Sequence, residues 1–268
     1  MEIKEIINML SDGKLNPTLV RNLLLSIRGK FIIPSIIFGK GTFIFRASLI
    51  SDIKEAENYR RLSYKPAELN THYQRASIPY NTMFYGIISN SYISAFGGCL
   101  GEICECLRDE NAIPKKYIVA ISFWELLNDM TLPAIIDPYG HNNKSKAFSI
   151  QEQLNEIISK NNLTNKSNNL AFLEFMNKEF KKRNIKESDY WISAIYTDII
   201  TKIMDYDGIV YESVQSVDPQ LSEVKCVALT PDFVDKNLIC SKAIIYEFDF
   251  ITKDVGIHPK KIHEISYL

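Results

Sequence analysis

The sequence from Arg75 to Glu102 reads RASIPYNTMFYGIISNSYISAFGGCLGE. Its middle, Thr82 to Ile88, is a short apolar run rich in aromatic and β-branched residues, which predicts a strand covered on both faces. From about Ile93 the apolar residues recur three and four apart, which predicts a helix. One strand–loop–helix unit is therefore expected to carry an arginine at its start, Tyr85 in its strand and a glutamate on its helix.

The helix has an apolar stripe, which predicts which glutamate points inward. Its members are Phe96, Leu100, Ile103 and Leu107, widened by Ala95, Cys99 and Cys106. At about 100° per residue, Glu102 lies at the margin of this stripe, and Glu105 lies roughly 60° further out, among Gly98 and Gly101. Glu102 is thus expected to face Tyr85, where a carboxylate could stabilise a developing positive charge while Arg75 holds a phosphate.

Taken singly, the same residue types more often have ordinary structural roles. Charged side chains such as Glu102 and Arg75 are usually exposed, and a strand tyrosine such as Tyr85 usually packs in a core.

Composition limits the classes of function. The chain has 268 residues, 46% of them hydrophobic, which is enough for a substantial core. Its 31 basic and 32 acidic side chains leave a formal charge of −1, so no global field recruits nucleic acid or an anionic membrane. The first residues, MEIKEIINML, are charged and amphipathic, and no apolar stretch approaches the ~20 residues that span a bilayer. We expect a soluble, cytoplasmic protein without membrane or direct nucleic-acid binding.

The cysteines and histidines indicate neither a disulfide framework nor a metal site. The five cysteines include no C-x-x-C pair, which fits a reducing compartment. The four histidines are isolated from them, so no metal is expected.

The order of elements predicts an α+β fold, a mixed β-sheet core with flanking helices. Expected strands cover residues 31–38, 42–47, 82–88, 117–123, 132–137, a short stretch ending near 213, 224–230 and 242–250. Expected helices cover 2–10, 16–27, 93–107, about 150–159, 170–183 and 189–204. We expect one domain over 1–268, with N-terminal helices in 1–30 and a helical insertion at about 138–190.

Arg46 lies inside the expected strand FIFRAS. It should need an anionic partner, from protein or ligand, because burying an unpaired charge is costly. Residues 48–81 are polar with little periodicity, and a loop of that length is more often functional than idle. This loop is expected to bring Tyr64, Tyr73 and Arg75 towards the site.

Several segments occur in an ordered set over roughly 42–248: FR-A with Arg46, Y-x-R-A-S with Arg75, FYG with Tyr85, the helical glutamate, DGIVYESVQS with Ser213, and VALTPDFVD. This set resembles the RES domain, a family named for its arginine, glutamate and serine and found as the toxin of bacterial toxin–antitoxin pairs. The resemblance implies an ADP-ribosyltransferase-like fold and destruction of NAD by hydrolysis or phosphorolysis of the nicotinamide–ribose bond. Some members transfer ADP-ribose to a macromolecule instead. A cognate antitoxin protein is the implied partner.

Carried over by residue, the resemblance implies that the catalytic residues are Glu102, Tyr85, Arg75 and Ser213, and that NAD is bound by Arg46, Arg75, Tyr85, Ser213 and Gln215. Cleavage produces an oxocarbenium-like ribose that a carboxylate stabilises. Arginine forks suit the pyrophosphate, a tyrosine face suits nicotinamide, and a serine hydroxyl suits the ribose or the carboxamide. NAD is then the substrate, no metal is required, and the choice between Glu102 and Glu105 stays open.

Two other classes of function remain open. Asp207, Glu223 and Lys225 could hold Mg²⁺ and a water in a metal-dependent nuclease. A non-catalytic RES-like module would bind a nucleotide or a partner without cleaving it.

Overall fold

The computed structural model describes residues 2–104, 116–139, 166–182, 186–212, 224–249 and 259–267. These residues form nine strands and six α-helices. Both antiparallel and parallel strand pairs occur, so the α+β class and the mixed strand pairing are confirmed. The ADP-ribosyltransferase-like form of that fold stays a prediction.

The chain divides into two compact units, each built from three separate segments. Unit 1 comprises Met1–Ile36, Pro66–Thr82 and Thr131–Val214, and unit 2 comprises Ile37–Lys65, Met83–Met130 and Gln215–Leu268. Because the segments are interleaved, neither unit is a continuous piece of chain. The expectation of one domain over 1–268 stays a prediction.

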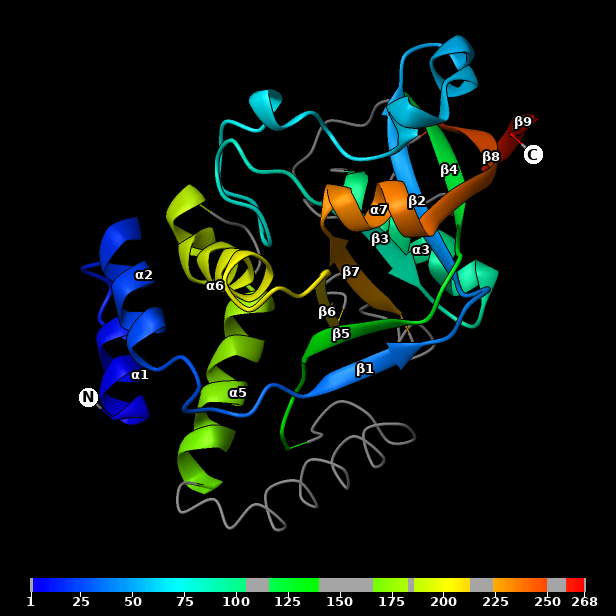
Figure 1. Cartoon of the computed structure of the whole chain (residues 1–268). Coiled ribbons are helices and arrows are strands. Elements are labelled where there is room, and N and C mark those ends of the chain that lie inside the picture. The colour runs from blue at the N-terminus through cyan, green and yellow to red at the C-terminus, as the bar shows by residue number, and fades with distance from the viewer. Residues whose placement is uncertain are drawn as a thin grey trace. The chain divides into compact units, whose positions relative to one another are not determined.

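Unit 1 is mainly helical (Figure 1). It contains α1 (Ile3–Ser11), α2 (Pro17–Ser26), α5 (Lys166–Phe180), α6 (Trp191–Lys202), the parallel strands β5 (Met130–Ile135) and β6 (Gly208–Glu212), and the 3-10 turns Ala67–Leu69 and Glu187–Tyr190. Helix α6 is buried from Ile192 to Thr201 and packs against α2 and α5. Helix α2 begins as the sequence predicts, because the side chain of Asn16 accepts a hydrogen bond from the Leu19 amide.

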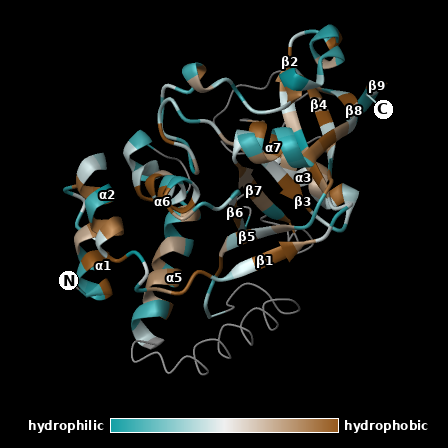
Figure 2. Cartoon of the chain, viewed as in Figure 1, coloured by the Kyte–Doolittle hydropathy of each residue, from teal (hydrophilic) through white to brown (hydrophobic). Residues whose placement is uncertain are grey.

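Unit 2 is built on antiparallel strands in the order β7 (Lys225–Leu229), β3 (Phe84–Ile88), β2 (Phe43–Ile50), β4 (Lys116–Leu126), β8 (Leu238–Asp249) and β9 (Lys260–Ser266). It also contains α3 (Tyr92–Ile103), α7 (Pro231–Asn237) and the 3-10 turns Ile53–Glu57 and Tyr59–Leu62. Hydrophobic residues are frequent on β3, β4 and β8 (Figure 2). Strand β1 (Ser35–Phe38) begins in unit 1 and ends in unit 2.

Strand β2 is paired unequally on its two sides. It pairs with β4 over its whole length, from Phe43↔Glu125 to Ile50↔Ile118. It pairs with β3 only at Phe45↔Ile87. Arg46 therefore lies where the pairing between β2 and β3 stops.

The predicted face of α3 is wrong in part. Gly98 and Gly101, which the wheel places outward, are buried, whereas Phe96 and Ile103 are only half-buried. A Cβ atom on Gly98 would lie 2.9 Å from side-chain atoms of both Ile87 and Val224. The helix packs most closely through its smallest residues, because only glycine permits that approach.

Other predicted elements differ from the structure in where they end, and two observed elements were not predicted. The expected strand over 31–38 is shortened to β1, and α7 and β9 are not predicted at all. In α7, Pro231 takes the first helical position, and Thr230 accepts from the Phe233 amide. In β9 exposed residues do not alternate with buried ones, so no period of two marks it. The expected helix at 150–159 lies outside the described residues.

Gly86 lets β3 approach β2, which yields a stability prediction. A Cβ atom at this position would lie 2.4 Å from Cγ2 of Ile44 and 3.3 Å from the Phe45 carbonyl oxygen. We expect Gly86→Ala to lower the free energy of unfolding by about 1 to 3 kcal/mol, measured by urea denaturation. Gly39→Ala is the matched control, because its Cβ would meet nothing closer than 3.9 Å; equal losses in both variants would contradict the packing argument.

Candidate functional site

Arg46 braces unit 2 through main-chain carbonyl groups. Its Nε donates to the carbonyl oxygens of Leu62 and Ser63, both at 3.1 Å. Its Nη1 donates to the carbonyl oxygen of Tyr85 at 2.6 Å, beside the point where β2 and β3 stop pairing. The guanidinium carbon lies 5.3 Å from the centre of the Phe84 ring. Arg46 thus joins β2 to β3 and to the end of the 3-10 turn Tyr59–Leu62.

Among the described residues Arg46 has no carboxylate acceptor, so the expectation of an anionic partner, from protein or ligand, stays a prediction for a ligand. All three of its acceptors are neutral carbonyl groups. Desolvation is the main cause that lowers the pKa of Arg46 from 12.5 to about 10, since burial disfavours the charged form. A half-buried guanidinium paired only with dipoles is a position where a bound anion would be stabilising.

Tyr85 and Glu102 belong to one face of the sheet in unit 2. Side chains alternate along a strand, so Tyr85 and Ile87 share a face, opposite to that of Phe84. Oε1 of Glu102 lies 3.6 Å from Sγ of Cys226, and Cys226 is paired with Ile87. The half-buried Glu102 therefore points inward from α3, as predicted.

The charges of Arg46 and Glu102 both act on the thiol of Cys99. Cys99 is buried on α3, and burial raises the pKa of its thiol to about 12. The Glu102 carboxylate raises this pKa further and the Arg46 guanidinium lowers it, so both charges lie close enough to act on one thiol. The structure thus brings Arg46, Tyr85 and Glu102 into one region of unit 2. The sequence offered no signal for Cys99 or Cys226 beyond their place in apolar runs.

Arg75 has a structural role within unit 1. Its Nη1 donates to the Phe180 carbonyl oxygen, and its Nη2 donates to the Lys182 carbonyl oxygen at 3.2 Å. Its guanidinium carbon lies 5.8 Å from the centre of the Tyr190 ring. Arg75 therefore caps the C-terminal end of α5, where carbonyl groups lack helical partners and a positive charge is favourable.

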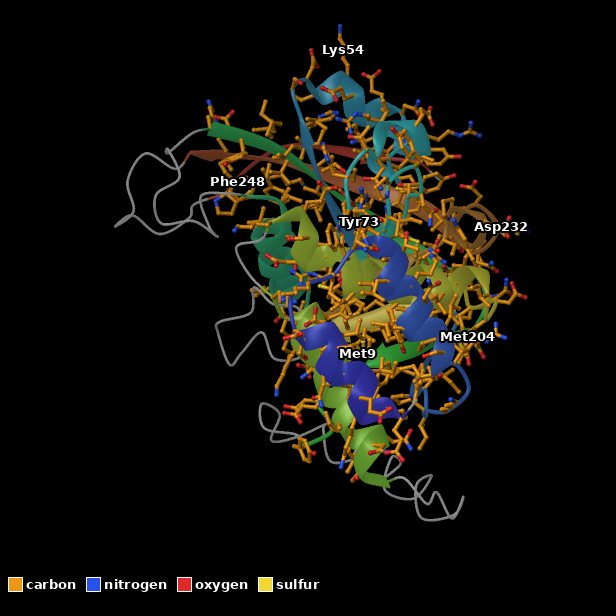
Figure 3. The ribbon with its side chains drawn as sticks, turned by 90° about the vertical axis from the view of Figure 1, so that its left-hand side faces the viewer. Met9, Lys54, Tyr73, Met204, Asp232 and Phe248 are labelled. Atoms are coloured by element: carbon orange, nitrogen blue, oxygen red, sulfur yellow. The ribbon has the colours of Figure 1, made fainter. Side chains whose placement is uncertain are left out.

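The other loop tyrosines are also bound within their own units. The hydroxyl of Tyr64 donates to Asp235 of α7 at 2.7 Å. Tyr73 (labelled in Figure 3) packs edge-on against Trp191, with ring centres 6.3 Å apart. Burial raises the pKa of Tyr73, and Arg21 opposes that shift. Each of these tyrosines therefore connects two segments of its own unit.

Four residues of the candidate sites lie outside the described residues: Glu105, Ser213, Gln215 and Glu223. For the nuclease alternative, Asp207 precedes β6 in unit 1 and Lys225 begins β7 in unit 2. Within the described part of the chain, no group of three or more His, Cys, Asp or Glu residues is placed to hold a metal ion. None of the described helices combines the length and apolar character of a membrane span.

Comparison with known proteins finds no matching family model, no matching curated protein and no matching solved structure. The resemblance to the RES family therefore rests on the ordered motifs alone.

The cap formed by Arg75 yields a prediction. Arg75→Lys keeps the charge but loses the two-pronged contact with the Phe180 and Lys182 carbonyl groups. We expect it to lower the free energy of unfolding by about 1 kcal/mol, measured by urea denaturation. Arg28→Lys, at an exposed position in unit 1, should have no effect. Unchanged stability of Arg75→Lys would contradict the capping role.

Proposed function

We propose that the protein is a RES-like enzyme that consumes NAD by cleaving the nicotinamide–ribose bond. One observation carries this proposal: Arg46 of β2 and Glu102 of α3 both act on the buried Cys99 thiol, and Arg46 also donates to the main-chain carbonyl oxygen of Tyr85 on β3. Arg46, Tyr85 and Glu102 are three of the residues that the resemblance assigns to NAD cleavage.

Arg46 supports an anionic substrate. Its described partners are neutral, so the charge that a ligand phosphate carries would complete its coordination. A pyrophosphate fits, because its oxygen atoms match the planar fork of a guanidinium.

Glu102 and Tyr85 support the chemistry of cleavage. When the N-glycosidic bond breaks, its electron pair leaves with the nicotinamide ring, which becomes neutral, and a positive charge develops on the ribose. The Glu102 carboxylate stabilises that charge, and the Tyr85 ring, on the same face, packs against nicotinamide. Water, phosphate or a macromolecule then supplies the nucleophile. As a toxin, such an enzyme would be controlled by a cognate antitoxin.

Products identify the reaction. The protein is incubated with NAD in phosphate buffer and in phosphate-free buffer, and the products are separated by chromatography. Nicotinamide with ADP-ribose indicates hydrolysis, and a phosphorylated ADP-ribose that appears only with phosphate indicates phosphorolysis. A parallel incubation with plasmid DNA and Mg²⁺ tests the nuclease assigned to Asp207, Glu223 and Lys225. Intact NAD in both buffers would overturn the proposal.

Glu102 provides the sharpest test of mechanism. Glu102→Gln keeps the side-chain shape and removes the charge, so nicotinamide release should fall about 10²- to 10³-fold, while NAD binding and the unfolding midpoint change little. Glu57→Gln is the control, because Glu57 is an exposed carboxylate of the same unit. Equal activity of the two variants would remove Glu102 from the mechanism.

Arg46 tests the anion site. Arg46→Lys in a Glu102→Gln background should weaken NAD binding about tenfold, since a lysine cannot reproduce the fork, as measured by titration calorimetry. Because Arg46 also braces the fold, circular dichroism must first show a folded variant. Unchanged affinity of a folded variant would leave Arg46 with a purely structural role.

A further inference from the structure

The thiol of Cys226 is in contact with the Glu102 carboxylate. Its Sγ lies 3.6 Å from Oε1 of Glu102, a distance at which a thiol donates to oxygen. An ionised carboxylate has no proton to give, so the thiol is the donor. Cys226 is 3% exposed and belongs to β7, which pairs with β3 along its whole length. The sheet therefore holds this donor in place.

A second contact confirms how α3 lies along β7. A Cβ atom on Gly98 would lie 2.9 Å from side-chain atoms of Val224 and of Ile87, the strand partner of Cys226. Gly98 and Glu102 are one turn apart on α3, which is about 6 Å along a helix. Val224 and Cys226 are two positions apart, which is about 6.7 Å along a strand. The two contacts agree in spacing, so the packing of α3 on the sheet brings Glu102 to the Cys226 thiol.

A glutamate needs such a contact to act at one place. Its side chain has several rotatable torsions, and ordering them costs conformational entropy. Glu102 is only half-buried, so the surrounding core does not order it alone. Donation from Cys226 favours the inward direction, towards the face of the sheet that Cys226 shares with Tyr85.

We infer that Cys226 is a positioning residue, whose thiol donates to the Glu102 carboxylate and holds it where the charge on the ribose develops. This inference rests on the proposed function. A thiol is a weak donor, so it orders the carboxylate and leaves most of its negative charge for the transition state. Because Cys226 acts through Glu102, its loss should lower kcat with little change in KM.

Three substitutions separate positioning from packing. Cys226→Ala removes the donor, so kcat for nicotinamide release should fall about tenfold, with KM for NAD within about twofold of wild type. Cys226→Ser supplies a hydroxyl donor and should keep kcat within about threefold of wild type. Cys240→Ala is the matched control, because Cys240 is a buried cysteine of the same unit whose thiol meets the Lys242 carbonyl oxygen. It should lower the melting midpoint as Cys226→Ala does and leave kcat unchanged.

Infrared spectroscopy tests the contact without any substrate. The S–H stretching band that disappears in Cys226→Ser belongs to Cys226. Glu102→Gln replaces the carboxylate with a neutral, weaker acceptor. The Cys226 band should therefore move to higher wavenumber in Glu102→Gln, and the Cys240 band should stay where it is.

Each outcome upholds or overturns the inference. Wild-type kcat in Cys226→Ala, equal losses of kcat in Cys226→Ala and Cys226→Ser, or a Cys226 band that does not move in Glu102→Gln would overturn the role of Cys226, while nicotinamide release by the wild type upholds the enzyme. Where Cys226→Ala does not fold, the band in Glu102→Gln decides alone. Absence of nicotinamide release from the wild type would overturn the proposed function and the positioning role with it, and a band that still moves would then identify a purely structural contact.

Discussion

The fold of unit 2 depends on one half-buried cation that is held by dipoles. Arg46 occupies the point where β2 stops pairing with β3, and its guanidinium replaces missing strand pairing with bonds to the carbonyl groups of Leu62, Ser63 and Tyr85. Hydrogen bonds from a charged donor contribute about 1.5 to 3 kcal/mol each, which offsets the desolvation that lowers the pKa of Arg46. Nε and Nη1 have carbonyl acceptors, but no carboxylate among the described residues balances the charge of the guanidinium. One interaction therefore both positions β3 and favours an anion.

Local signals in the sequence predict local structure well. The Asn16 cap of α2 and the apolar runs of β2, β3 and β4 follow from caps and periodicity. They succeed because each depends on neighbours within a few residues. The α+β class follows from the same elements.

Long-range partners decide the rest, and the sequence does not specify them. The acceptor of Arg75 on Phe180 is 105 residues away, so nothing near Arg75 indicates a helix cap. The face of α3 was misplaced because the hydrophobic wheel favours large residues, whereas Gly98 packs against Ile87 through its lack of a side chain. Strand β9 has no alternation because none of its residues is buried, and it is defined by its pairing with β8.

The two arginines that the motifs single out differ in what they can offer a ligand. A guanidinium has five N–H donors. In bonds between described residues, Arg46 uses Nε and one position on Nη1, so both donors of Nη2 lie outside those bonds. Arg75 uses both Nη1 and Nη2, the pair that forms a two-pronged contact with phosphate oxygen atoms. For Arg75 to bind pyrophosphate in that way, it would have to release the end of α5. The Nη2 of Arg46 can donate to an anion while Nε and Nη1 keep their carbonyl acceptors. The same side chain can therefore stabilise the fold and bind a ligand.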